Sequence, residues 1–182
     1  MIEGKQIIGF ELTASGTEKF NAFSPITGKR LDFSFYTATS AEVNTAAEKA
    51  ATAFQGYRNK TGIEKAIFLE TIGDEIMALG EELIAICCEE SALPKARIEG
   101  ERGRTVNQLK LFASVLREGS WLDARIETAD PSRSPLPKPD IRYMEIGLGP
   151  VVVFGASNFP LAFSVAGGDT ASALAAGCPV IV

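Results

Sequence analysis

The 182-residue sequence has no histidine and only three cysteines, Cys87, Cys88 and Cys178. Without histidine, these residues cannot supply an imidazole-based catalytic triad or a histidine metal ligand. The cysteines are odd in number and lack the CxxC spacing of a metal or redox site, so we expect no metal site. Reduced thiols that pack in the protein interior are the prediction for all three.

Long apolar runs and clusters of basic residues are also missing. No stretch approaches the ~20 apolar residues that a membrane span needs, and no basic segment followed by an apolar one marks a signal peptide. The net charge is −5, and the 18 lysines and arginines are scattered along the chain. These features disfavour nucleic acid and anionic membranes as partners. They predict a cytoplasmic protein with a sizeable core, since 46% of its residues are hydrophobic.

Short strands are expected in the first 36 residues. Residues 6–12 and 18–23 are strand candidates, and the turn residues 14–17 between them favour a β-hairpin. A second turn is predicted at 24–29. Alternating apolar and polar residues then predict a half-buried strand over 31–36.

Helices are expected next. Thr39 with Glu42, and Thr61 with Glu64, have the spacing of capping boxes, which mark helix starts. Behind them, apolar side chains keep a helical period to about position 56 in the first helix and position 86 in the second. A proline in a first-turn position favours a third helix over 95–118.

The last third of the chain predicts a change to α/β organisation. Four prolines among residues 130–140 indicate an extended connector, followed by a strand over 141–146. An apolar strand over 151–154, a helix over 160–176 and a strand over 179–182 then have the lengths of a parallel crossover unit.

Asn158 lies between that strand and that helix, where an open parallel sheet presents ligand-binding groups. An uncharged amide in this place can donate an N–H to an oxyanion. It can also cap the helix expected from Pro160, and spacing alone favours this second role. Gly155 and the pair Gly167-Gly168 do not form the G-x-G-x-x-G dinucleotide motif.

The segment from Gly149 to Pro160, with its continuation to Val182, closely resembles the aldehyde dehydrogenase superfamily. Its Asn-Phe-Pro sequence, beginning at Asn158, is the most specific part of the resemblance. Matching segments near the N-terminus and at 100–113 extend the resemblance over the whole chain. The Gly-Glu-Arg-Gly-Arg-Thr sequence there is similar to the NADP-linked branch that oxidises 2,5-dioxopentanoate (α-ketoglutaric semialdehyde).

The resemblance implies an α/β fold: the N-terminal part of a Rossmann-type domain, with an N-terminal β-hairpin and a helical layer. Residues 1–140 would form the hairpin and helices of the cofactor domain. Residues 141–150 would be an oligomerisation-arm strand, and 151–182 the first strand, helix and strand of the dinucleotide-binding sheet. A dimer or tetramer of identical subunits is therefore expected for the full-length protein.

The resemblance also implies oxidation of a small aldehyde with NADP or NAD, through a cysteine-bound thiohemiacetal whose oxyanion Asn158 stabilises. The family's nucleophilic cysteine and glutamate base would lie beyond Val182, so we expect an incomplete chain that is inactive alone. One alternative is a truncated, non-catalytic paralogue that assembles with full-length subunits, and another is a coenzyme-A-acylating relative that shares the same first half. The turn that lines the cofactor corresponds to Phe154, Gly155, Ala156 and Ser157.

Arg104 and Gln108 lie one helical turn apart and therefore share a face of their helix. In the resemblance this helix borders the substrate tunnel, and arginine pairs well with carboxylates. We predict that Arg104 anchors the carboxylate of the aldehyde and that Gln108 assists. The alternative is a surface arginine, either paired with Glu101 or exposed.

Overall fold

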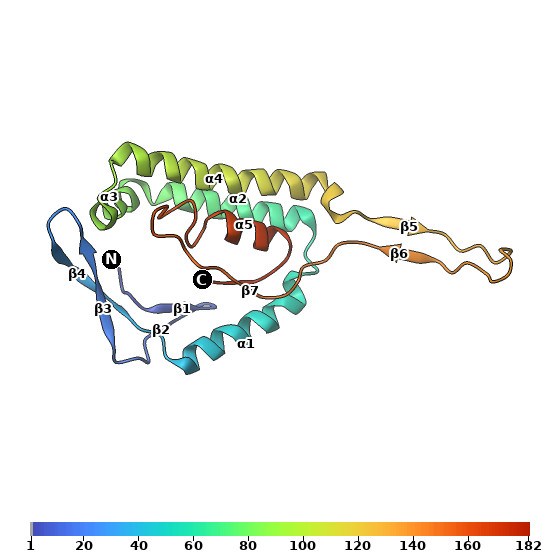
Figure 1. Ribbon diagram of the computed structural model, residues 1–182, viewed down its shortest axis with the longest axis horizontal. Coiled ribbons are helices and arrows are strands. Elements are labelled where there is room, and N and C mark those ends of the chain that lie inside the picture. The colour runs from blue at the N-terminus through green and yellow to red at the C-terminus, as the bar shows by residue number, and fades with distance from the viewer. Residues whose placement is uncertain (1) are drawn as a thin grey trace.

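The structure is a computed structural model that describes residues 2–182. Helices α2 (Gly62–Ala78) and α4 (Lys95–Glu118) pack along each other, and α5 (Gly168–Ala175) packs against both of them (Figure 1). Helix α1 (Ser40–Tyr57) contacts strands β1 (Gln6–Ile8) and β8 (Val180–Ile181) instead, on the other side of α5. The hairpin over residues 19–36 lies at one end of this body, the hairpin over residues 6–13 runs inward from there beside α1, and a long hairpin arm projects from the other end.

The helices are α1 (Ser40–Tyr57), α2 (Gly62–Ala78), α3 (Gly80–Ser91), α4 (Lys95–Glu118), α5 (Gly168–Ala175) and the short 3₁₀ helix η1 (Ser120–Leu122). The strands are β1 (Gln6–Ile8), β2 (Glu11–Thr13), β3 (Lys19–Ser24), β4 (Lys29–Tyr36), β5 (Arg125–Glu127), β6 (Ile141–Tyr143), β7 (Val151–Val152) and β8 (Val180–Ile181). None of the helices within residues 2–182 is both long and apolar enough to cross a membrane.

Both predicted capping boxes are confirmed. The side chain of Thr39 accepts a hydrogen bond from the backbone amide of Glu42, whose carboxylate accepts one from the Thr39 amide in return. Thr61 and Glu64 repeat this arrangement at the start of α2. Helix α4 runs over the residues that the sequence predicts. Local side-chain chemistry therefore sets where α1 and α2 begin.

The second predicted helix is wrong in its length, because two helices occupy that region. Helix α2 ends at Ala78 and α3 begins at Gly80. Gly80 has a φ of 56°, in the left-handed region that a continuous right-handed helix cannot contain. The apolar period continues across the break, which is why the pattern alone predicts one helix.

The predicted pairing of residues 6–12 with 18–23 is also wrong. Strand β1 pairs with β2 through a tight turn at Gly9, which has a φ of 66°. Strand β3 pairs with β4 instead, through the turn that the sequence predicts at 24–29. The structure thus has two hairpins in series, because the glycine inside the first apolar run reverses the chain earlier than the polar turn residues do.

The main core lies where α2, α4 and α5 meet. Leu69 and Leu109 are among its most deeply buried side chains, and half-buried residues such as Trp121 pack around them. The seven core residues are Ala66, Leu69, Leu109, Ala113, Leu116, Ala171 and Ala175. Four of these seven are alanines, which allow the three helices to approach closely and fix α4 relative to α5.

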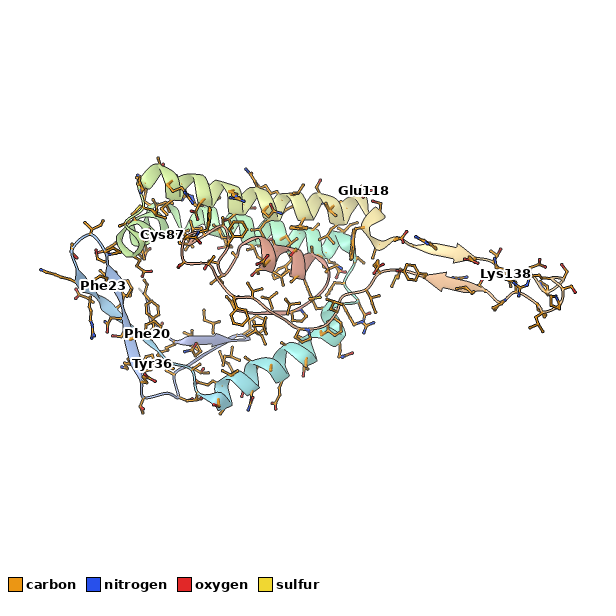
Figure 2. The ribbon with its side chains drawn as sticks, viewed as in Figure 1. Phe20, Phe23, Tyr36, Cys87, Glu118 and Lys138 are labelled. Atoms are coloured by element: carbon orange, nitrogen blue, oxygen red, sulfur yellow. The ribbon has the colours of Figure 1, made fainter. Side chains whose placement is uncertain are left out.

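The arm is an antiparallel hairpin of β5 and β6 that begins shortly after Glu118, where α4 ends (Figure 2). Lys138 lies farther out along it, where its amine is 3.1 Å from the carboxylate of Glu127. The proline-rich connector closes this hairpin, with a further antiparallel bridge between Asp130 and Lys138. The predicted strand over 141–146 therefore exists in part and pairs with β5.

The predicted crossover unit is confirmed in outline, since β7 and β8 pair in parallel and α5 connects them. Its helix is shorter than the predicted 160–176, because residues 157–167 form turns and α5 begins at Gly168. The backbone is folded tightly here: a Cβ added to Gly167 would lie 2.5 Å from the carbonyl oxygen of Ala162. A continuous helix cannot make that approach.

The pKa of Glu42 gives a first testable prediction. Hydrogen bonds from the backbone amides of Thr39 and Ser15 lower it from its ordinary value of 4.5 to about 2. Because the pKa is lowered in the folded state, the ionised carboxylate stabilises the fold above pH 4.5, and this contribution is lost as the pH falls towards 2. The thermal unfolding midpoint of Glu42→Gln should therefore lie below wild type at pH 7 and converge with it in acid.

Glu48→Gln, on the exposed face of the same helix, is the matched control, and its unfolding midpoint should stay close to wild type across this range. A Glu42→Gln deficit that is equal at pH 7 and pH 2.5 would show that the carboxylate charge is not what stabilises the cap.

Candidate active site

The turn predicted to line a cofactor begins directly after the carboxyl end of β7. The amide of Val153 still donates to the carbonyl of Ile181, at 2.8 Å, and the chain then leaves the sheet. Phe154 follows with 87% of its surface exposed. Residues 155–157 carry only a hydrogen, a methyl and a hydroxymethyl side chain, which leaves this edge of the parallel pair open.

Asn158 lies in the loop that follows and is exposed. It does not cap a helix, because α5 starts ten residues later and has Gly167 at its N-cap. The loop is held by its own backbone: Ala156 donates to the carbonyl of Phe163 at 2.7 Å, and Phe159 donates to Ala156 at 3.2 Å. The capping interpretation favoured by spacing is therefore wrong, because the side chain of Asn158 does not bind the start of any helix.

Phe159 anchors this loop against α4. The guanidinium of Arg97 lies 4.8 Å from the centre of its ring, and that of Arg104 lies 5.9 Å away. Phe163 packs edge-on against the same ring, with the two centres 5.3 Å apart. Arginine over an aromatic face is an attractive contact, so two residues of α4 hold the residue next to Asn158.

Glu101 connects α4 to the same loop and was not predicted as a site residue. Its side chain is 3% exposed, and one carboxylate oxygen lies 2.9 Å from Nε of Arg97. The other oxygen accepts from the backbone amides of Leu161 and Ala162, at 3.3 and 3.4 Å. Glu101 therefore pairs with Arg97 and not with Arg104. Only the i, i+4 spacing to Arg97 hinted at this in the sequence.

Arg104 and Gln108 do share a face, and both line a pocket of about 290 Å³ between α4 and the loop. Arg104 is exposed, and its guanidinium also lies 4.9 Å from the centre of the Phe163 ring. No carboxylate among residues 2–182 forms a salt bridge with it, although Asp169 lines the same pocket. Asn158 does not line this pocket.

A second pocket, of about 580 Å³, lies beside the turn that is predicted to line a cofactor. It is lined by Phe154 together with residues of β7 and α5. Asp169 and Ser172 of α5 line both this pocket and the one at Arg104. The structure thus places the predicted cofactor residue and the predicted substrate residues on two sides of one short helix.

None of the three cysteines has the setting of a catalytic nucleophile, although Cys178 lines the pocket beside Phe154. Cys178 is buried, as the sequence predicts, and Cys87 and Cys88 are half-buried free thiols. Burial raises the pKa of the Cys87 thiol, the opposite of what an activated nucleophile needs. Within the described part of the chain, no group of three histidine, cysteine or acidic residues is placed to hold a metal ion.

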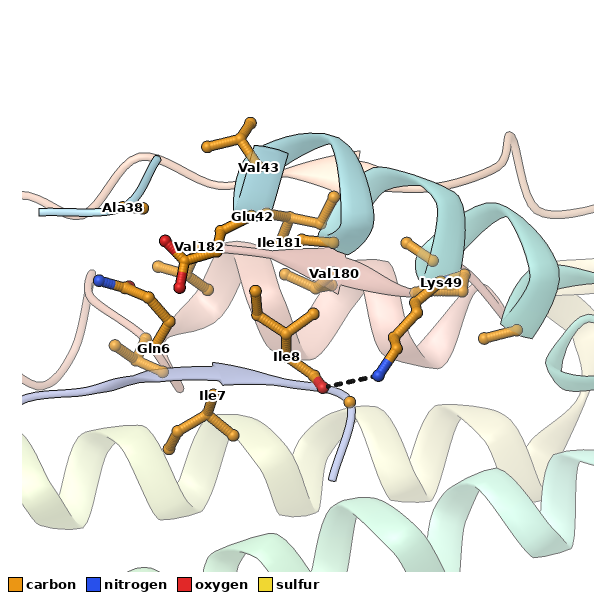
Figure 3. Close-up of a pocket in the computed structure, with 16 residues that line it drawn as sticks. Gln6, Ile7, Ile8, Ala38, Glu42, Val43, Lys49, Val180, Ile181 and Val182 are labelled. Carbon is orange, nitrogen blue, oxygen red and sulfur yellow. Dashed lines mark hydrogen bonds between the residues drawn. The ribbon is translucent and has the colours of Figure 1, made fainter. Parts of the chain in front are cut away.

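A further groove, of about 530 Å³, lies between β1, α1 and β8 (Figure 3). Its lining is mainly aliphatic, and Lys49 crosses it to donate to the carbonyl of Ile8 at 3.3 Å. The sequence predicts nothing here, because the groove depends on how three separate elements meet.

Known proteins resemble this chain in sequence. The aldehyde dehydrogenase family matches residues 12–182. Alpha-ketoglutaric semialdehyde dehydrogenase 2 of Azospirillum brasilense is 56% identical over 182 residues, which are 100% of this chain and 35% of that protein. The alpha-ketoglutaric semialdehyde dehydrogenase of Acinetobacter baylyi is 46% identical over 98% of this chain and 34% of its own length. The chain thus spans about a third of these relatives, and the predicted resemblance is confirmed.

Solved structures agree. Succinate-semialdehyde dehydrogenase from Burkholderia pseudomallei superposes with a TM-score of 0.80 at 30% identity, over 96% of this chain and 34% of that one. An NAD-dependent benzaldehyde dehydrogenase from Corynebacterium glutamicum superposes with a TM-score of 0.82 at 22% identity, over 99% of this chain and 37% of that one. The predicted α/β fold class is therefore confirmed. Family match, sequence identity and fold together show that this chain belongs to the aldehyde dehydrogenase family.

Proposed function

We propose that this chain forms the oxyanion-binding part of an NAD(P)-dependent dehydrogenase for a short carboxylated aldehyde such as 2,5-dioxopentanoate. The observation that carries the proposal is the exposed amide of Asn158, which caps no helix. Its loop is held against α4 by Arg97 and Glu101. The 56% identity to an enzyme named for α-ketoglutaric semialdehyde supports the substrate class.

In this proposal, Asn158 donates its side-chain N–H to the oxygen of the aldehyde as negative charge develops there. An amide suits the task because it donates a hydrogen bond without ionising, and an anchored loop keeps the donor oriented before the reaction. The thiol nucleophile and the general base would come from the remainder of the enzyme, since the cysteines of this chain are packed or unactivated.

The turn after β7 fits a nicotinamide cofactor, either NADP or NAD. It lies at the carboxyl end of a parallel strand, where open α/β sheets bind nucleotides. Phe154 presents an exposed ring, and Gly155, Ala156 and Ser157 leave room for a ribose beside it. When bound, the cofactor would accept a hydride from the substrate.

Arg104 is the residue that we propose binds the substrate carboxylate, with Gln108 assisting. The guanidinium lines a pocket, has the rings of Phe159 and Phe163 beneath it, and forms no salt bridge with a described carboxylate. Arginine binds carboxylates through two parallel hydrogen bonds, which also fixes the orientation of the aldehyde group.

The test compares aldehydes with and without a carboxylate. Reduced cofactor would be followed by its absorbance, with the complete enzyme that contains these residues and with 2,5-dioxopentanoate or pentanal as substrate. Arg104→Ala should lower kcat/KM for 2,5-dioxopentanoate about 10- to 200-fold, as expected for one charge-assisted contact of about 1.5–3 kcal/mol. Activity on pentanal should fall much less, only by the part that Arg104 contributes to holding Phe159.

Arg102→Ala, two positions earlier on α4, is the control, and it should preserve the preference for the carboxylated aldehyde. An Arg104→Ala enzyme with the wild-type preference would contradict the substrate assignment. Absence of any aldehyde oxidation by the wild-type protein would contradict the proposed function as a whole.

The hairpin arm supports assembly into a homo-oligomer. It projects from the body of the molecule (Figure 1). Several of its large apolar side chains are exposed. These are Ile126, Leu136, Ile141, Tyr143, Met144 and Ile146. An unpaired strand edge beside apolar side chains favours pairing with another chain. We therefore propose that the arm packs against a second copy, in a dimer or tetramer.

A further inference from the structure

The loop that carries Asn158 poses a positioning problem. Residues 153–167 contain no helix or strand, and Asn158 itself is exposed. Hydrogen-bond donors that act on a developing charge must be held to within about 0.5 Å of their working position. The backbone bonds inside the loop fix its shape, but they do not fix its place relative to the helical core.

Helix α4 supplies that connection through one face. Arg97, Glu101 and Arg104 are spaced four and three residues apart, so their side chains leave the same side of the helix. The two arginines lie over the ring of Phe159, and Glu101 reaches the backbone just beyond it. The three side chains therefore contact the loop on the C-terminal side of Asn158.

Glu101 is the central element of this contact. Its carboxylate is buried and satisfied on both oxygens, by Arg97 on one side and by the amides of Leu161 and Ala162 on the other. A buried ion pair adds little to stability compared with apolar side chains of similar size. The carboxylate instead fixes the position of the loop, because it accepts hydrogen bonds only from backbone amides that lie within its reach.

We propose that Glu101 is a positioning residue, which holds the 156–163 loop so that the amide of Asn158 faces the reacting oxygen. This inference rests on the oxyanion role proposed above. Glu101 itself touches no reacting atom: it binds the loop from the core side, while Asn158 is on the exposed side. Its effect on kcat should therefore pass through Asn158, whereas any shift of the cofactor residues Ala156 and Ser157 in the same loop should appear in the KM for the cofactor.

The test is a double-mutant cycle in the complete enzyme, with Glu101→Gln, Asn158→Ala and the two combined. Glutamine keeps an acceptor oxygen but loses the charge that draws Arg97 and the two amides together. Glu101→Gln alone should lower kcat about 10- to 100-fold, the size expected for a small misplacement, and change KM less than about twofold. In the Asn158→Ala background, the same change should lower kcat no further.

Glu99→Gln provides the matched control, because Glu99 is an exposed residue of the same helix whose partner Lys95 is 3.7 Å away. Its kcat should equal that of wild type. Arg97→Gln is a milder second variant, which leaves the bonds of Glu101 to the two amides in place. It should lower kcat in the same direction, by less, and also only when Asn158 is present.

The outcomes separate the two claims. A lower unfolding temperature with unchanged kcat in Glu101→Gln and Arg97→Gln would overturn the positioning role, as would a loss of kcat that persists in the Asn158→Ala background. If Glu101→Gln does not fold, the Arg97→Gln cycle decides by the same criteria. Wild-type kcat in Asn158→Ala alone would instead contradict the oxyanion role on which the inference rests.

Discussion

Replacing Asn158 by alanine should lower kcat for aldehyde oxidation by about 10²–10³-fold, which corresponds to about 2.7–4 kcal/mol of lost transition-state stabilisation. The reason is that the lost hydrogen bond strengthens as charge accumulates on the aldehyde oxygen. KM should change much less, since the ground-state carbonyl carries little of that charge.

The stability of this variant should stay near that of wild type, because the Asn158 side chain is exposed and caps no helix. Measuring both the thermal unfolding temperature and the kcat of Asn158→Ala distinguishes the oxyanion role from the capping role. The loss of a helix cap would cost about 0.5–2 kcal/mol of stability and leave kcat intact. Asn107→Ala, at an exposed position of α4, should change neither quantity.

The adjacent glycines Gly167 and Gly168 should respond in opposite ways to alanine. A Cβ at Gly167 would lie 2.5 Å from the carbonyl oxygen and 2.8 Å from the carbonyl carbon of Ala162. Backbone atoms cannot swing aside as a side chain can, so the loop must move. We expect Gly167→Ala to lose about 1–3 kcal/mol of unfolding free energy, and to lower kcat because the displaced loop carries Asn158.

Gly168→Ala is the matched control. A Cβ at Gly168 would meet nothing within 4 Å, and Gly168 is the first residue of α5. Alanine there should stabilise the protein by ~0.4–1 kcal/mol, because it restricts the unfolded chain without straining the folded one. Urea unfolding of both variants checks the pair. Equal stabilities would show that the loop does not approach α5 as closely as described.

The sequence predicts best those features that depend on neighbouring residues. The capping boxes at Thr39 and Thr61 can be found from a four-residue pattern, and α1 and α2 begin where that pattern places them. The shared face of Arg104 and Gln108 likewise follows from helical geometry alone. The parallel pairing of β7 with β8 follows from the length of the segment between them.

Features that depend on distant contacts could not be predicted in this way. Residues 160–167 have helix-compatible side chains, but the approach of Gly167 to Ala162 and the contact with α4 favour turns there. The role of Glu101 depends on two amides 60 and 61 residues further along the chain. The strand partners in the first 36 residues differ from prediction because a single glycine, Gly9, allows an earlier reversal.

Helix α4 carries both the arginine that we propose reads the substrate and the glutamate that we propose holds the oxyanion donor, only three residues apart. Its buried face is fixed in the core by Leu109 and Ala113, so the helix moves as a rigid unit or not at all. Any tilt that adapts Arg104 to a longer or shorter aldehyde would also shift Glu101. Evolution of a new substrate length in this scaffold should therefore proceed through side-chain replacement at Arg104 and Gln108, and rarely through movement of the helix.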